Sequence, residues 1–212
     1  IVSYQFNAGG AVLNTVLMDE TGNSLISIQT GTIIAAIFII AYTMLAGLVS
    51  VAYTDVANGI IIIFSFVIAI PIFLAQAGGF SGMAASFEAM GKPEHMNFFG
   101  VYSTMDIINF CLPPFLLIMG DANMYQRIFA SKDAKGAEQA TKVLIFAVLL
   151  AELMIIFSAW VASSMIPDAE VGKYVLIYAA HKLLPTFLGA IMMTTIVGII
   201  ISTADSFLLV PA

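Results

Sequence analysis

Apolar runs of about twenty residues recur along this sequence and constrain the fold more than any other feature. A helix needs about 20 mainly apolar residues to cross the hydrocarbon core of a bilayer. The sequence predicts a partial crossing at residues 1–18 and full crossings at residues 31–50, 56–76, 104–120, 143–166 and 187–210. We therefore expect an all-α, polytopic membrane protein in which residues 1–212 form a single transmembrane region.

The composition agrees with a membrane protein and excludes other classes. Hydrophobic residues make up 61% of the chain and charged residues 9%, whereas soluble domains carry about 25% charged residues. Acidic residues outnumber basic ones by 13 to 7, so nucleic-acid binding has no electrostatic support. Cys111 stands alone, which argues against a disulfide framework and a cysteine metal site.

The segments between the crossings carry further expectations. A very short turn at residues 51–54 should separate the first two full crossings, and Pro71 should bend the second. The loop at residues 77–103 is long enough for a short surface helix. The chain begins without Met, inside what reads as an element already under way, and stops after an apolar run. We expect it to be a fragment of a longer chain.

Basic residues in the short loops predict the orientation. Residues 121–142 form a charged connector, and its basic residues, four of the seven in the chain, are Arg127, Lys132, Lys135 and Lys142. We therefore place this connector in the cytoplasm, in a multi-pass protein of the plasma (inner) membrane. Alternation then puts the 51–54 turn on the same side. Asp55 and Asp205 should consequently lie at similar depth in the inner half of the membrane.

The last crossing contains a polar turn within an apolar helix. Its members are Ser202, Thr203, Asp205 and Ser206. Residues at i, i+3 and i+4 share a helix face, and the carbonyl of Ile199 points towards the hydroxyls of the first two. Such oxygens are costly in hydrocarbon unless they face a partner helix, water or an ion, which indicates a sodium site. Close helix packing through small hydroxyl residues, and simple solvation of Asp205, remain open.

The acidic residues Asp55 and Glu152 each allow a structural and a functional interpretation. Asp55 follows Thr54 directly before an apolar run, which is typical of a helix N-cap. It also lies at the depth expected for Asp205. Glu152 lies near the middle of its crossing. It is either a neutral, buried acid or a group that lines a substrate path or carries a proton.

Pro113 and Pro114 are expected to interrupt the crossing at residues 104–120. The carbonyls of Asn109 and Phe110 lose their usual helical donors, because proline has no N–H. Non-helical backbone is tolerated at membrane depth where it lines a cavity, and broken helices mark transporter binding sites. This predicts a substrate path at the two carbonyls, and a kink absorbed by neighbouring helices is the alternative.

Three segments resemble the sodium:solute symporter family, which includes sodium-coupled glucose, proline and pantothenate carriers. They are AGLVSVAYTDVANG (46–59), MYQRIFASKDAKGA (124–137) and IISTADSFLL (200–209). They are similar to the family's "GGL-x-A-V-x-W-T-D-V-x-Q" segment, its "QR-x-x-x-A-K" connector and its "S-T-x-x-S" helix. Their order and spacing match the family across essentially the whole chain. The resemblance implies part of a leucine-transporter fold of two inverted five-helix repeats, from the end of core helix 3 to core helix 8.

The resemblance also implies roles for individual residues. The principal sodium site would take the Ile199 carbonyl and the hydroxyls of Ser202 and Thr203, together with carbonyls of core helix 1. A second sodium site or an ion-release path would comprise Asp55, Asp205 and Ser206. Asp205 replaces what can be a serine in the family, which makes this second site more anionic.

The substrate is less constrained by the resemblance. Tyr53 and Asn58 stand where Trp and Gln are common, which leaves the subfamily open. Val148 lies where sugar carriers of the family can have a lysine, so a sugar is less favoured. Glu152, one turn further on the same face, makes an amine-bearing substrate an option.

These observations predict a transporter rather than an enzyme. We expect a sodium-coupled secondary active symporter that imports a small organic solute, with Na⁺ as coupling ion and no other cofactor. The alternative is a symporter-like membrane sensor region fused to a signalling domain. Two membrane acids also suggest an intramembrane aspartyl protease, but the G-x-G-D type segment of such enzymes is absent from the sequence.

Overall fold

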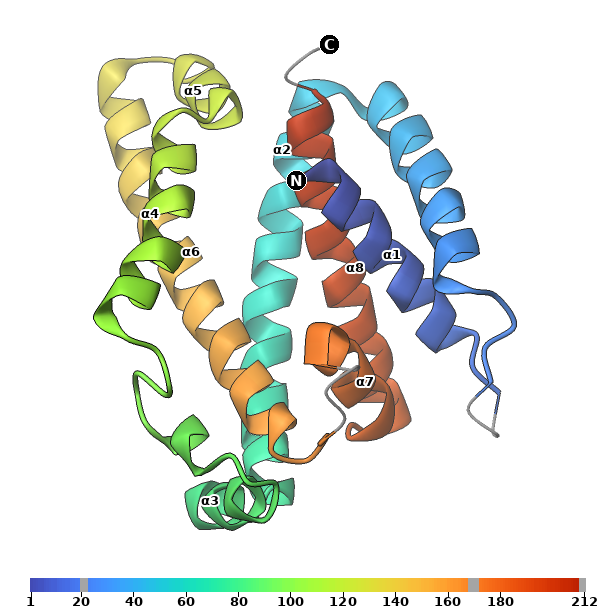
Figure 1. Cartoon of the computed structure of the whole chain (residues 1–212). Helices are drawn as coiled ribbons and strands as arrows, with labels where there is room; N and C mark the ends of the chain where they lie inside the picture. Colours follow the sequence, from blue (N-terminus) through green and yellow to red (C-terminus); the bar gives the residue numbers. More distant parts are fainter. Residues whose placement is uncertain (20–22, 168–171, 210–212) are drawn as a thin grey trace.

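The computed structural model of this chain describes residues 1–19, 23–167 and 172–209, and this part of the chain is helical without strands. Figure 1 shows the helices in sequence colours. Their bounds are α1 (Val2–Val16), α2 (Ile28–Gln76), α3 (Gly79–Ala89), α4 (Thr104–Met119), α5 (Ala122–Phe129), α6 (Ala134–Ser163), α7 (Val175–Lys182) and α8 (Thr186–Leu208). Short 3₁₀ turns at Pro93–Met96 and Gly172–Tyr174 lie between them.

Five segments in the described part of the chain are long and apolar enough to cross a membrane. They are Ile28–Leu45, Ser50–Gln76, Thr104–Gln126, Ala134–Ser163 and Thr186–Leu208. α1 has 15 residues, or about 22 Å of helix, which is shorter than the roughly 30 Å of a hydrocarbon core. The all-α, polytopic membrane architecture predicted from the apolar runs is confirmed.

α2 contains two spans joined at a single non-helical residue. Gly47 has φ 66° and ψ 170°, a conformation that glycine adopts far more readily than residues with a side chain. We call Ile28–Leu45 the first arm and Ser50–Gln76 the second arm. The turn predicted at residues 51–54 is therefore wrong in position. Asp55 lies inside the second arm, so its interpretation as a helix N-cap is also wrong.

The two arms of α2, together with α1, α7 and α8, enclose most of the core. Its largest fully buried side chains include Ile39 on the first arm, Phe66 and Phe73 on the second, and Met192 on α8. α1 crosses the first arm with its backbone in direct contact, since a Cβ added at Gly10 would lie 2.6 Å from the carbonyl oxygen of Ile28. Small residues allow such close crossings between membrane helices.

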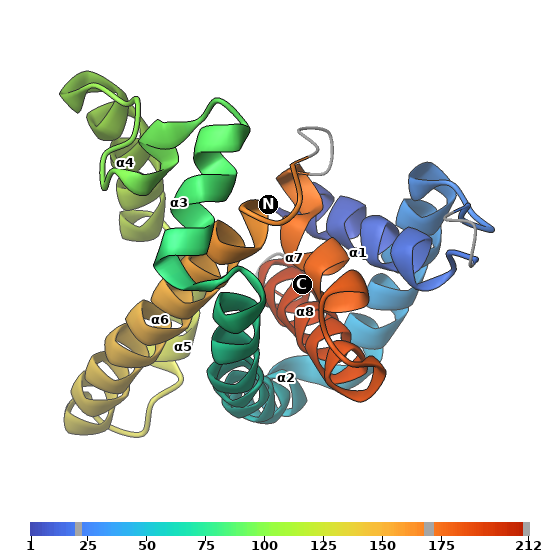
Figure 2. The same ribbon diagram turned by 90° about the horizontal axis from the view of Figure 1, so that it is seen from below.

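The connecting segments gather at the two ends of the helices. In Figure 1, α5, the junction between the arms of α2 and the C-terminal end of α8 lie at one end, while α3 and α7 lie at the other. α3 is seen end-on in Figure 1 and lengthwise in Figure 2, so it lies across the direction of the long helices. The expected surface helix in the 77–103 loop is thus α3. The α2 junction and α5 share one end, as the predicted alternation requires; that this end faces the cytoplasm stays a prediction.

Candidate ion and solute site

Among the described residues, three polar contacts hold α8 against the second arm of α2. They join Asp55 to Ser202, Asn58 to Gly198 and Ser65 to Thr195. The Ser202 hydroxyl donates to the Asp55 carboxylate, and the Asn58 amide donates to the Gly198 carbonyl oxygen at 3.4 Å. Positions 195, 198 and 202 are three and four residues apart and therefore share one helix face. This face fixes the register between the two helices and brings Asp55 beside Ser202.

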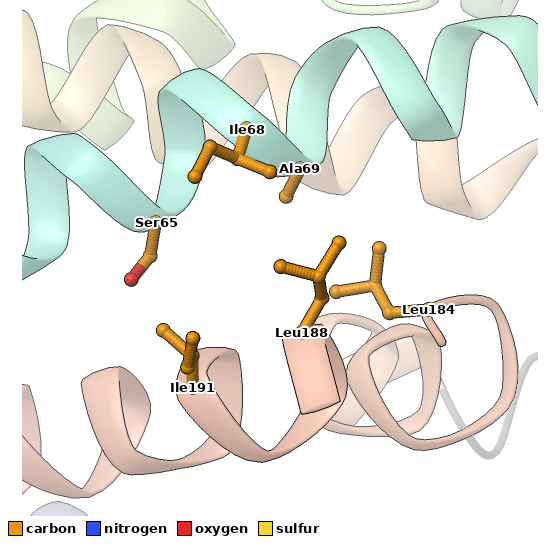
Figure 3. Close-up of a pocket in the computed structure, with 6 residues that line it drawn as sticks. All are labelled: Ser65, Ile68, Ala69, Leu184, Leu188 and Ile191. Atoms are coloured by element: carbon orange, nitrogen blue, oxygen red, sulfur yellow. The ribbon is translucent and has the colours of Figure 1, made fainter. Parts of the chain in front are cut away.

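The contact furthest from Asp55 is a buried hydroxyl pair. The oxygens of Ser65 and Thr195 are 2.6 Å apart, and Thr195 also bonds the Ile191 carbonyl oxygen at 2.9 Å. Because the Thr195 hydroxyl donates its hydrogen bond to that carbonyl, the Ser65 hydroxyl is the donor in its contact with Thr195. Figure 3 shows Ser65 beside a cavity of about 10 Å³, the size of one water molecule. Its other walls are Ile68, Ala69, Leu184, Leu188 and Ile191.

Replacement of Ser65 with alanine is expected to destabilise the protein modestly, by about 1 kcal/mol, because hydroxyl pairs between membrane helices contribute little net energy. The measurement is thermal unfolding in detergent. Ser81→Ala, at an exposed hydroxyl of α3 that bonds only locally, is the control and should not change the melting temperature. Equal melting temperatures of Ser65→Ala and Ser81→Ala would contradict a stabilising role for the Ser65–Thr195 pair.

Asp205 has a neighbour that the sequence did not indicate. Its side chain is 1% exposed, and its carboxylate accepts a hydrogen bond from the Thr43 hydroxyl on the first arm of α2. The same hydroxyl contacts the Ile39 carbonyl oxygen at 2.8 Å. α8 is therefore hydrogen-bonded to both arms, through Asp205 to the first and through Ser202 to the second. Asp55 and Asp205 do not share one solvent-facing pocket.

A cavity of about 850 Å³ opens where α8 and the second arm face α5, α6 and the end of α4. Its walls are mainly aliphatic. The polar side chains on it are Asp55, Asp121, Asn123, Ser131, Thr141, Glu152, Ser202, Thr203 and Ser206. Among the described lining residues, three carboxylates and five hydroxyls thus meet in one cavity. Asp55 comes from α2 and three of the hydroxyls come from α8, which is far from Asp55 in the sequence.

A break in a membrane helix borders this cavity, but it is not at the prolines. α4 continues through Pro113 and Pro114, because the fixed φ of proline is compatible with a helix even though two donors are lost. The helix ends at Gly120, and the Asp121 carboxylate caps α5 by accepting the Asn123 N–H at 3.0 Å. The segment Thr104–Gln126 as a whole has the length and apolarity of a membrane span. The interruption predicted at Pro113–Pro114 is therefore wrong, and the broken helix lies about two turns later.

The structure brings together six of the predicted site residues. Those on the cavity wall are Asp55, Val148, Glu152, Ser202, Thr203 and Ser206. Those outside it are Ile199 and Asp205 on α8, and Asn109 and Phe110 on α4. Phe110 is 63% exposed and its ring packs against Tyr102, with centroids 5.4 Å apart.

Sequence reasoning missed Thr43, Asp121 and Asn123. Thr43 is a lone hydroxyl in an apolar run, 162 residues from the acid that it contacts, so no local pattern indicates it. The Gly120–Asp121 pair was assigned to the end of a crossing and the start of a connector. A glycine followed by an N-capping acid is nevertheless a recognisable signal for the end of one helix and the start of another.

The model of the sodium:solute symporter family matches residues 2–212 of this chain. The chain belongs to the sodium:solute symporter family. The resemblance found in the three sequence segments is thereby confirmed, together with the membrane, sodium and symport character that the family carries. This is a family of transporters rather than of enzymes. Comparisons with curated proteins and with solved structures gave no match.

Proposed function

We propose that this chain is part of a sodium-coupled secondary active symporter that imports a small organic solute across the plasma membrane. The observation that carries the proposal is the convergence of Asp55 with Ser202, Thr203 and Ser206 on one wall of a cavity of about 850 Å³. Membership of the sodium:solute symporter family supports the choice of sodium. A cavity of this volume is within the range of small-molecule sites.

The principal sodium site in this proposal consists of the Ile199 carbonyl and the hydroxyls of Ser202 and Thr203. The contact between Ser202 and Asp55 supports it, because the hydroxyl proton points to the carboxylate and the lone pairs of Ser202 remain available to a cation. Asp55 also places a negative charge beside the ion. Its role is therefore to orient Ser202 and to attract sodium into the cavity.

Asp55 and Ser206 line the cavity beyond this site and provide a second sodium site or an ion-release path. Asp205 lies outside the cavity and contributes to this site through its negative charge. Its carboxylate accepts a hydrogen bond from the Thr43 hydroxyl. Sodium binding stabilises the outward-open state, and its dissociation towards the cytoplasm permits inward opening. Such a shift needs only different sodium affinities in the two states.

Replacement of Asp205 with asparagine is expected to lower the number of sodium ions transported per solute molecule. The carboxamide oxygen can still accept the Thr43 hydrogen bond, so folding is retained while the negative charge is lost. The measurement is the ratio of sodium flux to solute flux in proteoliposomes. Thr43→Ser, which keeps both the hydroxyl and the acid, is the control; an unchanged ratio in Asp205→Asn would exclude the acid from ion coupling.

The experiment that tests the proposed function is solute uptake by the complete protein, reconstituted into proteoliposomes with an imposed sodium gradient. A panel of radiolabelled sugars, amino acids, carboxylates and amines is compared in sodium and in potassium. We expect at least one solute to accumulate in sodium and to leak out when the sodium gradient is collapsed. Uptake of no solute, or equal uptake in both salts, would overturn the proposal.

A further inference from the structure

Glu152 is an acid within a membrane-spanning helix, and its side chain faces the large cavity. It lies on α6, whose segment Ala134–Ser163 is apolar enough to cross a bilayer, and the residue is exposed. Within the described part of the chain it takes part in no hydrogen bond or ion pair. A carboxylate at membrane depth is costly unless it has a partner, which makes it a functional residue by default.

The other two carboxylates of the cavity already have partners. Asp55 accepts a hydrogen bond from Ser202, and Asp121 caps the N-terminus of α5. No lysine, arginine or histidine is found among the described side chains that line the cavity. Among the described side chains of the lining, none pairs with Glu152, and its carboxylate is open to a ligand in the cavity.

The surroundings of Glu152 favour an organic cation over a metal ion. Its neighbours on the same wall are aliphatic, namely Leu144, Ile145, Val148 and Leu149. Thr141, the hydroxyl of α6 that lines the cavity, is 11 positions away, or about 16 Å along the helix. A small inorganic cation needs several oxygens around it, whereas an ammonium group with an apolar body needs one carboxylate and an apolar wall.

We propose that Glu152 selects the solute of this symporter and that the solute is an organic cation, an ammonium group attached to an apolar body. This inference rests on the proposed symport function and gives the substrate class of the same cavity. The ammonium group pairs with Glu152 while the body packs on Val148 and Leu149. The aliphatic wall beside Glu152 favours an apolar body over a sugar ring, because it offers no hydrogen-bond partner to sugar hydroxyls that would lie against it. Amino acids are disfavoured because the described lining offers no cation to their carboxylate.

The test compares matched solutes in sodium-driven proteoliposomes that contain the complete protein. Each pair consists of an alkylammonium compound and its neutral isostere with carbon in place of nitrogen, and zwitterionic amino acids are the third set. We expect sodium-dependent uptake of the cations and none of their isosteres. Glu152→Gln should raise the KM for the cation by roughly 30-fold or more, as expected for loss of one partner of a charge pair that the bound solute shields from water.

Two further variants separate recognition from folding. Glu138→Gln makes the same change on α6 at a surface pair with Lys142 and should leave KM unchanged. Val148→Lys places a cation one turn from Glu152, where it pairs with the acid and should abolish cation uptake without removing the carboxylate.

Sodium binding is measured separately, as sodium-dependent thermal stabilisation without solute. Loss of cation uptake in Glu152→Gln with sodium stabilisation intact supports the inference. Sodium-dependent uptake of a neutral or zwitterionic solute that Glu152→Gln and Val148→Lys leave unchanged overturns it, while the proposed symport function stands. If the wild-type protein shows neither sodium stabilisation nor sodium-dependent uptake, both proposals fail.

Discussion

Valine in place of Gly10 is expected to destabilise the protein by about 3 kcal/mol or more, because it forces α1 away from the first arm of α2. Even a single methyl at this position would lie 2.6 Å from the Ile28 carbonyl oxygen and 2.4 Å from the Thr32 hydroxyl oxygen. The contact is reciprocal, since a Cβ at Gly31 would lie 2.7 Å from the Gly10 carbonyl oxygen. Side-chain rotation cannot relieve a clash with backbone atoms, so the whole helix must move.

The measurement for Gly10→Val is the melting temperature of the purified protein in detergent, together with its amount in the membrane. Gly59→Val is the matched control, because Gly59 is also within a helix but has no atom within 4 Å of the added Cβ. We expect a large drop in melting temperature for the first variant and a small one for the second. Similar melting temperatures would show that α1 and α2 do not cross at these glycines.

Removal of both hydroxyls at Ser202 and Thr203 is expected to have the largest effect on transport. Each alanine substitution removes one oxygen of the proposed principal sodium site, and each should raise the sodium concentration for half-maximal uptake by about tenfold. The double variant should raise it by about a hundredfold if the two effects add, although neighbouring residues often deviate from additivity. Solute uptake itself should persist at high sodium concentration, because the α6 residues proposed to contact the solute are unchanged.

The measurement is the sodium dependence of uptake in proteoliposomes. Thr203→Ser keeps the oxygen and should remain close to wild type. Thr194→Val provides a second control on α8, since the Thr194 hydroxyl bonds the Ala190 carbonyl of its own helix and lies outside the cavity. Wild-type sodium dependence in both Ser202→Ala and Thr203→Ala would remove the assignment of the principal site.

The membrane architecture was predictable from the sequence because it depends on local composition. A run of apolar residues longer than a bilayer is thick leaves few alternatives to a crossing helix. The polar turn at Ser202–Ser206 was recognisable for the same reason, since four polar residues in one turn contrast with their apolar surroundings. Helical spacing predicted one face for Ser202, Asp205 and Ser206. Ser202 and Ser206 do line the cavity, whereas Asp205 lies outside it and contacts Thr43 on the first arm of α2.

Helix breaks were predicted less well, because a sequence shows which residues disfavour a helix but not which break the packing requires. Pro113 and Pro114 disfavour a helix more strongly than Gly120, yet the chain bends at Gly120 and Asp121, where a cap can form. The break at Gly47 likewise lies ahead of the turn predicted at residues 51–54.

Partners far apart in the sequence were partly predictable. The predicted orientation placed Asp55 and Asp205 at similar depth, but it did not indicate that their carboxylates accept hydrogen bonds from Ser202 and Thr43, respectively. The rotation of each helix about its own axis decides such pairings. That rotation depends on the packing of α8 between the two arms of α2, which involves residues spread over most of the chain.

The attachment of α8 to both arms of α2 has a mechanical consequence. Together with α1, these segments form a tightly packed frame, whereas α4 has no buried residues and makes few contacts with the other helices. During a transport cycle we expect α4 to move relative to this frame, with the Gly120–Asp121 break as the hinge. In the proposed symporter, the sodium ions would then stay bound to the frame, and the solute would be released when α4 moves away from the cavity.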